Sequence, residues 1–304
     1  MGTLGGGRGF GSVLGDFGLQ PGQLPQGTAA VFMLQESMAV GEMADGKMAV
    51  STVSTALREL LTSSPSAKVI HINLSGLAQP GQGLVFVYTD PDGLLGADAE
   101  VLVGLSDSAS MQRVMLGGGA GRLPDVVAGG SGLPMTRLLF TEEERQALDT
   151  TFSVLKFKSS RLAFVNVYQP TTVHDGTPHY LEVAWRFKLL AAKAVSAAVY
   201  ELRKQDYDVI IGMDANTDMT ATFTDMAAPG ERLQHAFRSL ELRSAWGADD
   251  QATRGSRLID FVFSNLEAVA SGCVAPGQLD LKSDHSLVWA VYEVAKAAKR
   301  RRLH

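Results

Sequence analysis

Short runs of apolar and β-branched residues, separated by polar turns, recur along the chain and predict a series of β-strands. The first run, Val31-Phe32-Met33-Leu34, predicts a short buried strand that ends at Gln35-Glu36. Proline cannot donate to a strand ladder, so Pro170 is expected to stop a later strand. Further strands are expected where the same kind of run occurs, over residues 68–73, 83–88, 161–168, 208–211, 258–264 and 287–292.

Two segments instead space their apolar residues three and four positions apart, which is the period of one face of a helix. One covers residues 48–61 and the other follows Pro170. Their apolar stripes are Val53, Leu57, Leu60 and Leu61 in the first and Val183, Phe187, Leu190 and Ala194 in the second. Strands and helices mixed along one chain predict an α/β or α+β fold with layered sheets.

Glycine and proline divide the chain into regions. Residues 1–30 are rich in Gly, Pro and Gln and are expected to form an irregular lead-in. Residues 31–295 are expected to form a single domain with a loop-rich insertion around residues 90–150. Residues 296–304 are expected to form a basic tail.

The composition is that of an ordinary soluble globular protein, with 45% hydrophobic and 19% charged residues in a chain of 304. No apolar run approaches the ~18 residues of a membrane span, and the N-terminus lacks the basic start and apolar stretch of a secretory signal. The single cysteine, Cys273, excludes an internal disulfide and a cysteine-based zinc cluster, and it is expected to be buried and inert. We therefore expect an intracellular protein that is neither secreted nor bound to a membrane.

The net charge of −5 argues against a broad electrostatic attraction to nucleic acid. Basic residues nevertheless gather in the tail and at Lys156, Lys158 and Arg161. The tail could contact phosphate backbones or act as a nuclear address, and a frayed, solvated terminus is the alternative. A nuclear or organellar location is compatible with this charge distribution.

Three short polar signatures stand next to predicted strands in the last third of the chain. They are Gly212-Met213-Asp214-Ala215-Asn216, Arg257-Leu258-Ile259-Asp260-Phe261 and Ser283-Asp284-His285. Carboxylates, an amide and an imidazole delivered to one edge of a sheet are the groups that metal-assisted cleavage of a phosphoester requires. The sequence therefore indicates a candidate catalytic site at this edge.

The spacing of residues within each signature indicates how their side chains can be oriented. Asp214 and Asn216 are two residues apart, so an extended backbone would project both side chains from one face, ~7 Å apart. A turn rich in Asp and Asn that caps the strand is the alternative. Asp284 and His285 are adjacent and are expected on the loop before the last strand, where Asp260 could fix the imidazole tautomer. A histidine on the surface is the alternative for that pair.

The order of five motifs resembles that of the endonuclease/exonuclease/phosphatase superfamily, which includes exonuclease III, AP endonucleases, DNase I and the endonuclease domains of non-LTR retrotransposons. The motifs are Gln35-Glu36, Tyr168-Gln169-Pro170, Asp214-Ala215-Asn216, Ile259-Asp260 and Ser283-Asp284-His285, and they extend over residues 31–292. Residues 165–170 and 251–261 are similar to the nuclease branch, and the second segment looks like that of retrotransposon-type endonucleases. The resemblance implies a four-layer α/β sandwich of two stacked mixed β-sheets flanked by helices, with the site at one edge.

The resemblance also implies a divalent metal ion. Glu36 would bind Mg²⁺ or Mn²⁺, and Asp284 and Asp214 would support the metal or its bound water. Hard oxygen ligands of this kind suit both ions, and the ion would neutralise charge that develops on the phosphate oxygens.

Catalytic roles follow from the same resemblance. Asp214 would orient or deprotonate the attacking water, and Asn216 would hold the scissile phosphate, which Tyr168 would also contact. His285, oriented by Asp260, would stabilise or protonate groups on phosphorus. A well-placed acid or base of this kind contributes ~10²–10⁴-fold to the rate.

The implied function is that of a divalent-metal-dependent phosphodiesterase, and more specifically a DNA endonuclease that hydrolyses the backbone with activated water. Nucleic acid is then the expected partner, DNA rather than RNA. One alternative is a catalytically inactive member that serves as a structural or binding subunit of a larger protein or ribonucleoprotein assembly. Another is a phosphatase or a sphingomyelinase-like hydrolase.

Two departures from the superfamily pattern affect the expected site. The first strand of the family carries an Asn before Gln-Glu, whereas the 34 residues before Gln35 are rich in glycine. Asp16 is one candidate for that position, while Asn73 matches the local pattern but follows Gln-Glu and is interpreted as the end of an ordinary strand. Gly212-Met213-Asp214 also replaces the adjacent Gly-Asp of the family, which could shift the loop by one residue.

Overall fold

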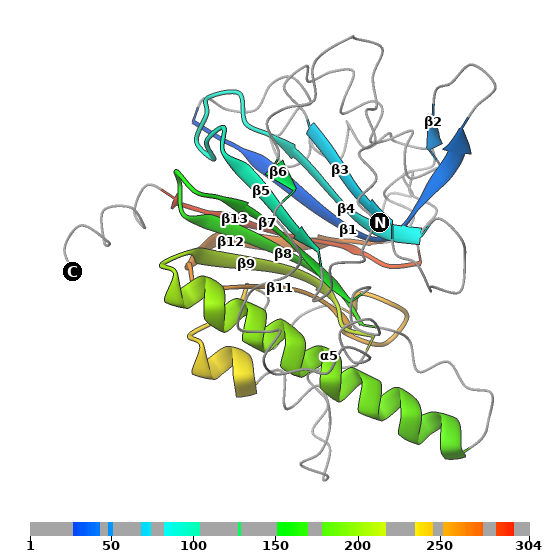
Figure 1. Cartoon of the computed structure of the whole chain (residues 1–304). Coiled ribbons are helices and arrows are strands. Elements are labelled where there is room, and N and C mark those ends of the chain that lie inside the picture. Colours follow the sequence, from blue (N-terminus) through cyan, green and yellow to red (C-terminus); the bar gives the residue numbers. More distant parts are fainter. Residues whose placement is uncertain are drawn as a thin grey trace, which may run out of the picture.

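The structure is a computed structural model that describes residues 27–42, 48–50, 68–73, 82–103, 127–128, 151–169, 178–216, 235–245, 252–275 and 284–294. Within these residues, two β-sheets stack face to face and a long helix covers the outer face of the larger one (Figure 1). A two-stranded sheet and a short helical segment at residues 235–239 complete the described part. The predicted α/β fold with two stacked sheets is confirmed, although only the larger of the two sheets is mixed.

The larger sheet has seven strands and is mixed. Its order is β10 (Arg243–Ser244), β11 (Asp260–Ser264), β9 (Asp208–Asp214), β8 (Leu162–Tyr168), β7 (Phe152–Phe157), β5 (Ala99–Val103) and β6 (Val127–Ala128). Strands β8 and β9 run parallel and are connected through helix α5 (Pro178–Lys204), whereas β11 runs antiparallel to β9. The carboxyl end of β9 therefore lies beside the amino end of β11, at one edge of the sheet.

The smaller sheet has four antiparallel strands. Its order is β2 (Met48–Val50), β1 (Ala30–Glu42), β4 (Gln82–Thr89) and β3 (Lys68–Asn73). The pairing of β1 with β4 shifts register between Leu34 and Ser37, so the chain is irregular at Gln35 and Glu36. Strands β12 (Ala268–Val274) and β13 (Leu287–Tyr292) pair separately, and β13 packs against the core between the two larger sheets.

Strand β8 is buried on both faces because it lies between two hydrophobic cores. Ala163, Val165 and Val167 face helix α5 and belong to the core beneath it. The alternate residues Leu162 and Phe164 pack between the sheets with apolar side chains of β4 and β7. A strand buried on both sides appears in the sequence as a continuous apolar run, which is why this strand is predicted well.

Helix α5 buries a stripe of small and branched side chains against the parallel strands. The stripe consists of Ala191, Ala194, Val195, Ala198 and Leu202, at helical spacing. Pro178 at the first helical position suits a helix start, because an N–H there would lack a partner within the helix. The predicted helix after Pro170 is confirmed.

One buried amide links the two sheets. Asn166 in β8 donates hydrogen bonds to the carbonyl oxygens of Leu34 in β1 (3.0 Å) and Val85 in β4 (3.1 Å). Its Oδ1 accepts a bond of 2.7 Å from Gln35 Nε2, which also lies 3.4 Å from the carbonyl oxygen of Gly212 in β9. Because buried polar groups are costly unless they are paired, these bonds fix the position of β1 over β8 and β9.

Three local expectations differ from the structure. The first strand does not end at Gln35-Glu36 but continues to Glu42, because its main chain goes on pairing with β4 and then with β2. Residues 48–50 form strand β2 instead of the start of a helix, because they pair with β1; residues 51–61 lie outside the described residues. Cys273 on β12 is half-buried rather than fully buried.

Other expectations fall largely outside the described residues. These are the lead-in at residues 1–26, residues 104–126 and 129–150 of the predicted insertion, and the tail at residues 296–304. Asn73 ends β3, an ordinary strand that pairs with the following strand β4. Among the described helices, none combines the length and apolar character that crossing a membrane requires.

Candidate active site

The edge at which β9 ends collects acidic side chains from two neighbouring strands. Asp214 is the last residue of β9 and Asp260 is the first residue of β11, and the two are register partners. Tyr168, the last residue of β8, is the partner of Asp214 on its other side. Main-chain pairing continues one residue further, from Ala215 N to Ile259 O at 2.8 Å. The strand ladder therefore places both carboxylates.

The residue pattern of β9 explains how Asp214 reaches this edge. Gly212 faces β1, where an added β-carbon would lie 2.8 Å from Met33 Cε. Met213 points to the opposite face and is buried in the core under α5. Met213, which separates Gly212 from Asp214, is therefore part of the strand, and Asp214 shares the inter-sheet face with Gly212.

His285 lies beside both carboxylates. Its Nδ1 is 3.0 Å from each carboxylate oxygen of Asp260 and 4.0 Å from Asp214 Oδ2, while its Nε2 is 3.9 Å from Asp284 Oδ1. A hydrogen on Nδ1 is thus directed at Asp260. Burial opposes the charged imidazolium, but the hydrogen bond and charge of Asp260, together with the charge of Asp214, outweigh it and raise the pKa of His285.

Thr253 connects the loop of His285 to the strand of Asp260. The residue is fully buried, and its Oγ1 accepts hydrogen bonds from the N–H groups of Ile259 and Asp260, each at 3.0 Å. Its carbonyl oxygen accepts a bond of 2.7 Å from Ser286 N. Sequence reasoning includes Thr253 only within a longer segment and gives it no role, because a single threonine carries no local signal for such a contact.

Asn216 closes a turn around Asp214. Its backbone is left-handed, with φ at 46°, and its N–H donates to Asp214 Oδ1 at 2.9 Å. Its Nδ2 donates to Asp214 Oδ2 at 3.2 Å and to the carbonyl oxygen of Gln169 at 2.7 Å. The backbone is therefore not extended, and the alternative, a turn built from Asp and Asn, is what the structure contains. Contact between Asn216 and a phosphate stays a prediction.

Lys188 of helix α5 lies behind this turn. Its Nζ donates to the carbonyl oxygen of Asn216 at 2.7 Å. Burial lowers the pKa of Lys188 to about 8; the charge of Asp214 opposes this shift and the charge of Arg257 adds to it. Sequence reasoning misses Lys188, because no motif surrounds it.

Asp284 is exposed to solvent and pairs with Arg254, a residue to which the sequence analysis gives no role. Its side chain is 68% exposed, and its Oδ2 accepts a hydrogen bond of 2.8 Å from Arg254 Nε. Partial burial would raise the pKa of Asp284, but the hydrogen bond and charge of Arg254, with the charge of His285, lower it. Support of a metal or of its water by Asp284 stays a prediction.

The contacts predicted for Glu36 and Tyr168 are not seen in the described part of the structure. Glu36 lies in β1, and its side chain lies outside the described part of the structure. Its neighbour Gln35 reaches β8 and β9, as described above. Tyr168 is 4% exposed and packs in the core between the sheets, so its contact with a phosphate stays a prediction.

Asp214 and Asp260 bring carboxylate oxygens that could hold a metal ion together beside His285, and candidate ligand atoms of the three residues lie within 4.8 Å of one another. Carboxylate oxygens are the ligands that Mg²⁺ and Mn²⁺ prefer. A carboxylate oxygen can accept more than one bond, so the bonds from Asn216 leave Asp214 with capacity for a cation. The donor set therefore fits a divalent cation that prefers oxygen.

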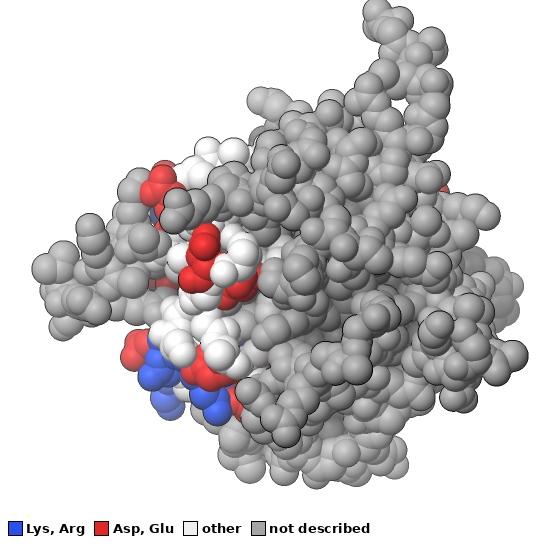
Figure 2. Space-filling model, turned by 90° about the horizontal axis from the view of Figure 1, so that it is seen from above, with Lys and Arg blue, Asp and Glu red and all other residues white. Residues whose placement is uncertain are grey.

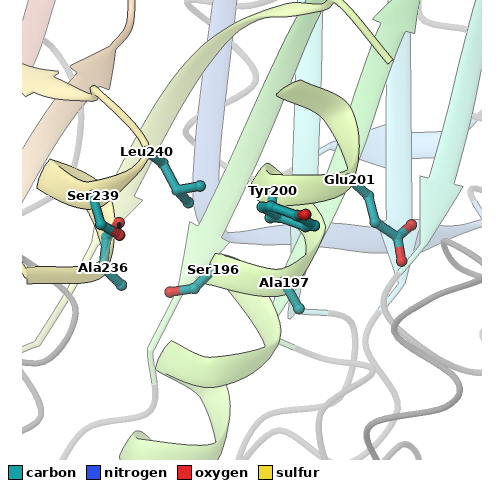
Figure 3. Close-up of a pocket in the computed structure, with 7 residues that line it drawn as sticks. All are labelled: Ser196, Ala197, Tyr200, Glu201, Ala236, Ser239 and Leu240. Carbon is teal, nitrogen blue, oxygen red and sulfur yellow. Dashed lines mark hydrogen bonds between the residues drawn. The ribbon is translucent and has the colours of Figure 1, made fainter. Parts of the chain in front are cut away.

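A cavity of about 340 Å³ lies elsewhere, between α5 and the segment at residues 235–240 (Figure 3). It is lined by Ser196, Ala197, Tyr200, Glu201, Ala236, Ser239 and Leu240. Ser196 follows Lys188 by eight positions, which corresponds to ~12 Å along a helix. None of the predicted site residues lines this cavity, so it is separate from the candidate active site.

No protein-family model matches the chain, and no curated protein matches it. Solved structures do match. An AP endonuclease from Archaeoglobus fulgidus has a TM-score of 0.52 and 8% identity, with 93% of this chain and 92% of that chain covered. The catalytic domain of Xenopus laevis APE2 has a TM-score of 0.49 and 17% identity, covering 94% and 89%. An endonuclease/exonuclease/phosphatase family protein from Leptotrichia buccalis has a TM-score of 0.48 and 12% identity, covering 86% of each chain.

Identities this low establish a likeness of fold and nothing more. The likeness to the AP endonuclease extends over nearly the full length of both chains. It agrees with the order of the motifs from Gln35-Glu36 to Ser283-Asp284-His285. The protein therefore has a fold similar to that of this AP endonuclease, as the resemblance drawn from the motifs predicts.

Proposed function

We propose that this protein is a divalent-metal-dependent phosphodiesterase. The observation that carries the proposal is the convergence of Asp214, Asp260 and His285 at the edge where β9 ends. Because one fold can host many reactions, the proposal depends on these groups and not on the fold alone. Two oriented carboxylates and an imidazole with a raised pKa are suited to water attack at phosphorus.

Each side chain has a distinct part in the proposed reaction. Asp214, with both oxygens held by Asn216, is placed to orient a water molecule or to accept its proton. Asp260 binds the hydrogen on Nδ1 of His285 and favours the charged imidazolium, whose second hydrogen, on Nε2, can be donated to an oxygen on phosphorus. Mg²⁺ or Mn²⁺ bound by the carboxylates, with Glu36 and Asp284 as predicted ligands, would neutralise charge on the phosphate.

We further propose that the substrate is DNA and the reaction that of an endonuclease. The fold shared with an AP endonuclease supports this choice. Arg254 and the exposed Arg257 lie on the short loop just before Asp260, which places two cations next to the proposed site. Since the net charge is −5, contact with a polyanion would depend on such local groups.

Cleavage of supercoiled, nicked and abasic DNA with Mg²⁺, with Mn²⁺ and with a chelator tests the proposal. We expect metal-dependent cleavage that falls steeply with added salt, as phosphate contacts are screened. His285→Ala should lower the rate by ~10²–10⁴-fold, the usual contribution of an acid–base group. His235→Ala, which changes an exposed histidine in the segment at residues 235–239, is the matched control and should leave the rate unchanged.

Two results would contradict the proposal and favour its rivals. Absence of cleavage with any metal, combined with stable assembly into a larger complex, would favour an inactive structural subunit. Hydrolysis of small phosphomonoesters that does not depend on salt, without DNA cleavage, would favour a phosphatase.

A further inference from the structure

Lys188 interrupts the apolar face that helix α5 buries next to the site. Its side chain is 2% exposed and is one of the largest buried side chains among the described residues. The next positions on this face, Ala191, Ala192 and Val195, are apolar and pack in the core under the helix. Burying an ammonium group is costly unless it is paired, so the contacts of Lys188 indicate why it is there.

The amine of Lys188 contacts the turn that encloses Asp214. Its Nζ donates to the carbonyl oxygen of Asn216 at 2.7 Å. The N–H and the side-chain amide of the same Asn216 reach the two carboxylate oxygens of Asp214, at 2.9 and 3.2 Å. Asn216 therefore links the helix to the carboxylate that is proposed to handle water, because its carbonyl binds Lys188 while its N–H and side-chain amide bind Asp214.

We propose that Lys188 is a positioning residue for the phosphodiesterase reaction, an inference that rests on the function proposed above. Its ammonium group holds the Asn216 carbonyl and so keeps the turn closed around Asp214. The left-handed backbone of Asn216 is one that Asn tolerates, and the hydrogen bonds around it select this conformation for the turn. An apolar side chain of the same length would fill the space but would leave this carbonyl without its donor.

Steady-state kinetics of two substitutions test the inference. Lys188→Met keeps a similar side-chain length and removes the donor, and it should lower kcat by ~10–100-fold, as for other residues that orient a reactive group. KM should stay within about twofold, because the groups that contact substrate remain. Lys188→Arg, which keeps charge and donors, should restore part of the activity.

Val195→Ala is the matched control, because it removes packing from the same buried face without touching the turn. It should lower thermal stability and leave kcat unchanged. Wild-type kcat in Lys188→Met would overturn the inference. So would a fall of kcat in Val195→Ala as large as that in Lys188→Met, because the effect would then be a general weakening of packing.

A second measurement does not depend on activity. In the metal-free protein, the side-chain amide protons of Asn216 can be assigned by comparison with Asn216→Asp and followed by NMR. In Lys188→Met we expect them to shift toward the positions of a free amide and to exchange faster with water. Unchanged signals would overturn the positioning role even if the wild-type protein cleaves no DNA, so this result and a failure of the proposed function can be told apart.

Discussion

Each side chain that we propose to take part in the reaction is oriented by another residue at a defined atom. Asn216 holds both oxygens of Asp214, and Asp260 holds Nδ1 of His285. Thr253 in turn fixes the main chain at Asp260. Groups that are oriented before substrate arrives lose little entropy in the reaction, so small displacements of their supports should reduce the rate strongly.

Replacing Asp260 by Asn should lower the pKa of His285, because the amide lacks the negative charge that helps to overcome burial and can offer His285 only a neutral acceptor. The stabilisation that the charged His285 gives the folded state is complete below the ordinary histidine pKa of ~6.5 and is lost as the pH rises through the raised folded pKa. Asp260→Asn should therefore lose stability mainly at acidic pH. NMR titration of His285 in the metal-free protein, with urea unfolding at acidic and alkaline pH, checks both statements.

Asp206→Asn is the control for this titration. Asp206 is exposed, lies beyond the opposite end of β9 and has a left-handed backbone that Asn also tolerates. It should leave the pKa of His285 where it is. An unchanged pKa in Asp260→Asn would mean that the carboxylate does not act on the imidazole as described.

Residues with a motif around them could be predicted from the sequence, whereas their supports could not. Asp214, Asp260 and His285 each stand beside a strand in an ordered set, and the structure brings them together. Lys188 meets Asn216 across 28 positions, through the packing of α5 on the sheet, and no local pattern encodes that contact. Arg254 likewise meets Asp284 across 30 positions.

Among the elements, β8 determines how the two sheets are joined. One face of β8 packs under α5 and the other packs between the sheets. Asn166 is the polar exception on the inter-sheet face, and its bonds hold β1 next to β9, where the irregularity at Gln35 and Glu36 occurs. The position of the predicted metal ligand Glu36 therefore depends on a side chain in a different sheet.

Asn166→Leu should destabilise the protein by several kcal/mol. It keeps a similar volume but removes the donor from two carbonyl oxygens, and each buried polar group deprived of its partner costs ~1–3 kcal/mol. Urea unfolding measures the change. Ser153→Ala is a matched control at the register partner of Asn166 in β7, where the buried Oγ has no hydrogen-bond partner among the described residues. It should be neutral or stabilising, and an equal destabilisation in both variants would contradict the role of Asn166.

The elements that sequence reasoning misses need information from distant parts of the chain. Strand β7 carries Lys156 within its buried run, and the charge of Lys156 pairs with Glu100 on β5 at 3.4 Å. Strand β12 contains Gly272, which in a sequence suggests a turn. In the structure Gly272 lies against the indole of Trp289 on β13, where a β-carbon would overlap the ring.

At the scale of the whole molecule, the basic residues of the β7–β8 turn are used internally. Lys158 pairs with Glu100 at 3.1 Å, and the guanidinium of Arg161 lies 5.5 Å from the centre of the Tyr207 ring. This turn precedes β8, whose other end reaches the candidate site, ~20 Å away along a strand of seven residues. In Figure 2, basic side chains stand beside acidic ones at the lower left of the described part of the face shown, and a separate group of acidic side chains lies above them.

Deleting residues 296–304 should therefore weaken binding to DNA more than removing the charge of Lys158 in the β7–β8 turn does. The tail carries basic residues at Lys296, Lys299, Arg300, Arg301 and Arg302, and the salt slope should fall by about one for each phosphate that the truncated protein no longer neutralises. Fluorescence anisotropy at several salt concentrations measures this. Lys158→Gln is the control and should leave the slope unchanged, while unfolding of the truncated protein would show that the tail is structural.

The alternation of faces along β9 has a consequence for variation in this chain. Gly212 faces the smaller sheet, Met213 faces the helix and Asp214 faces the site. Insertion or deletion of one residue within the strand would exchange these environments, placing a thioether among the polar groups and a carboxylate in the core. We therefore expect that the fold does not tolerate insertions or deletions within β9, even at positions where it tolerates substitutions.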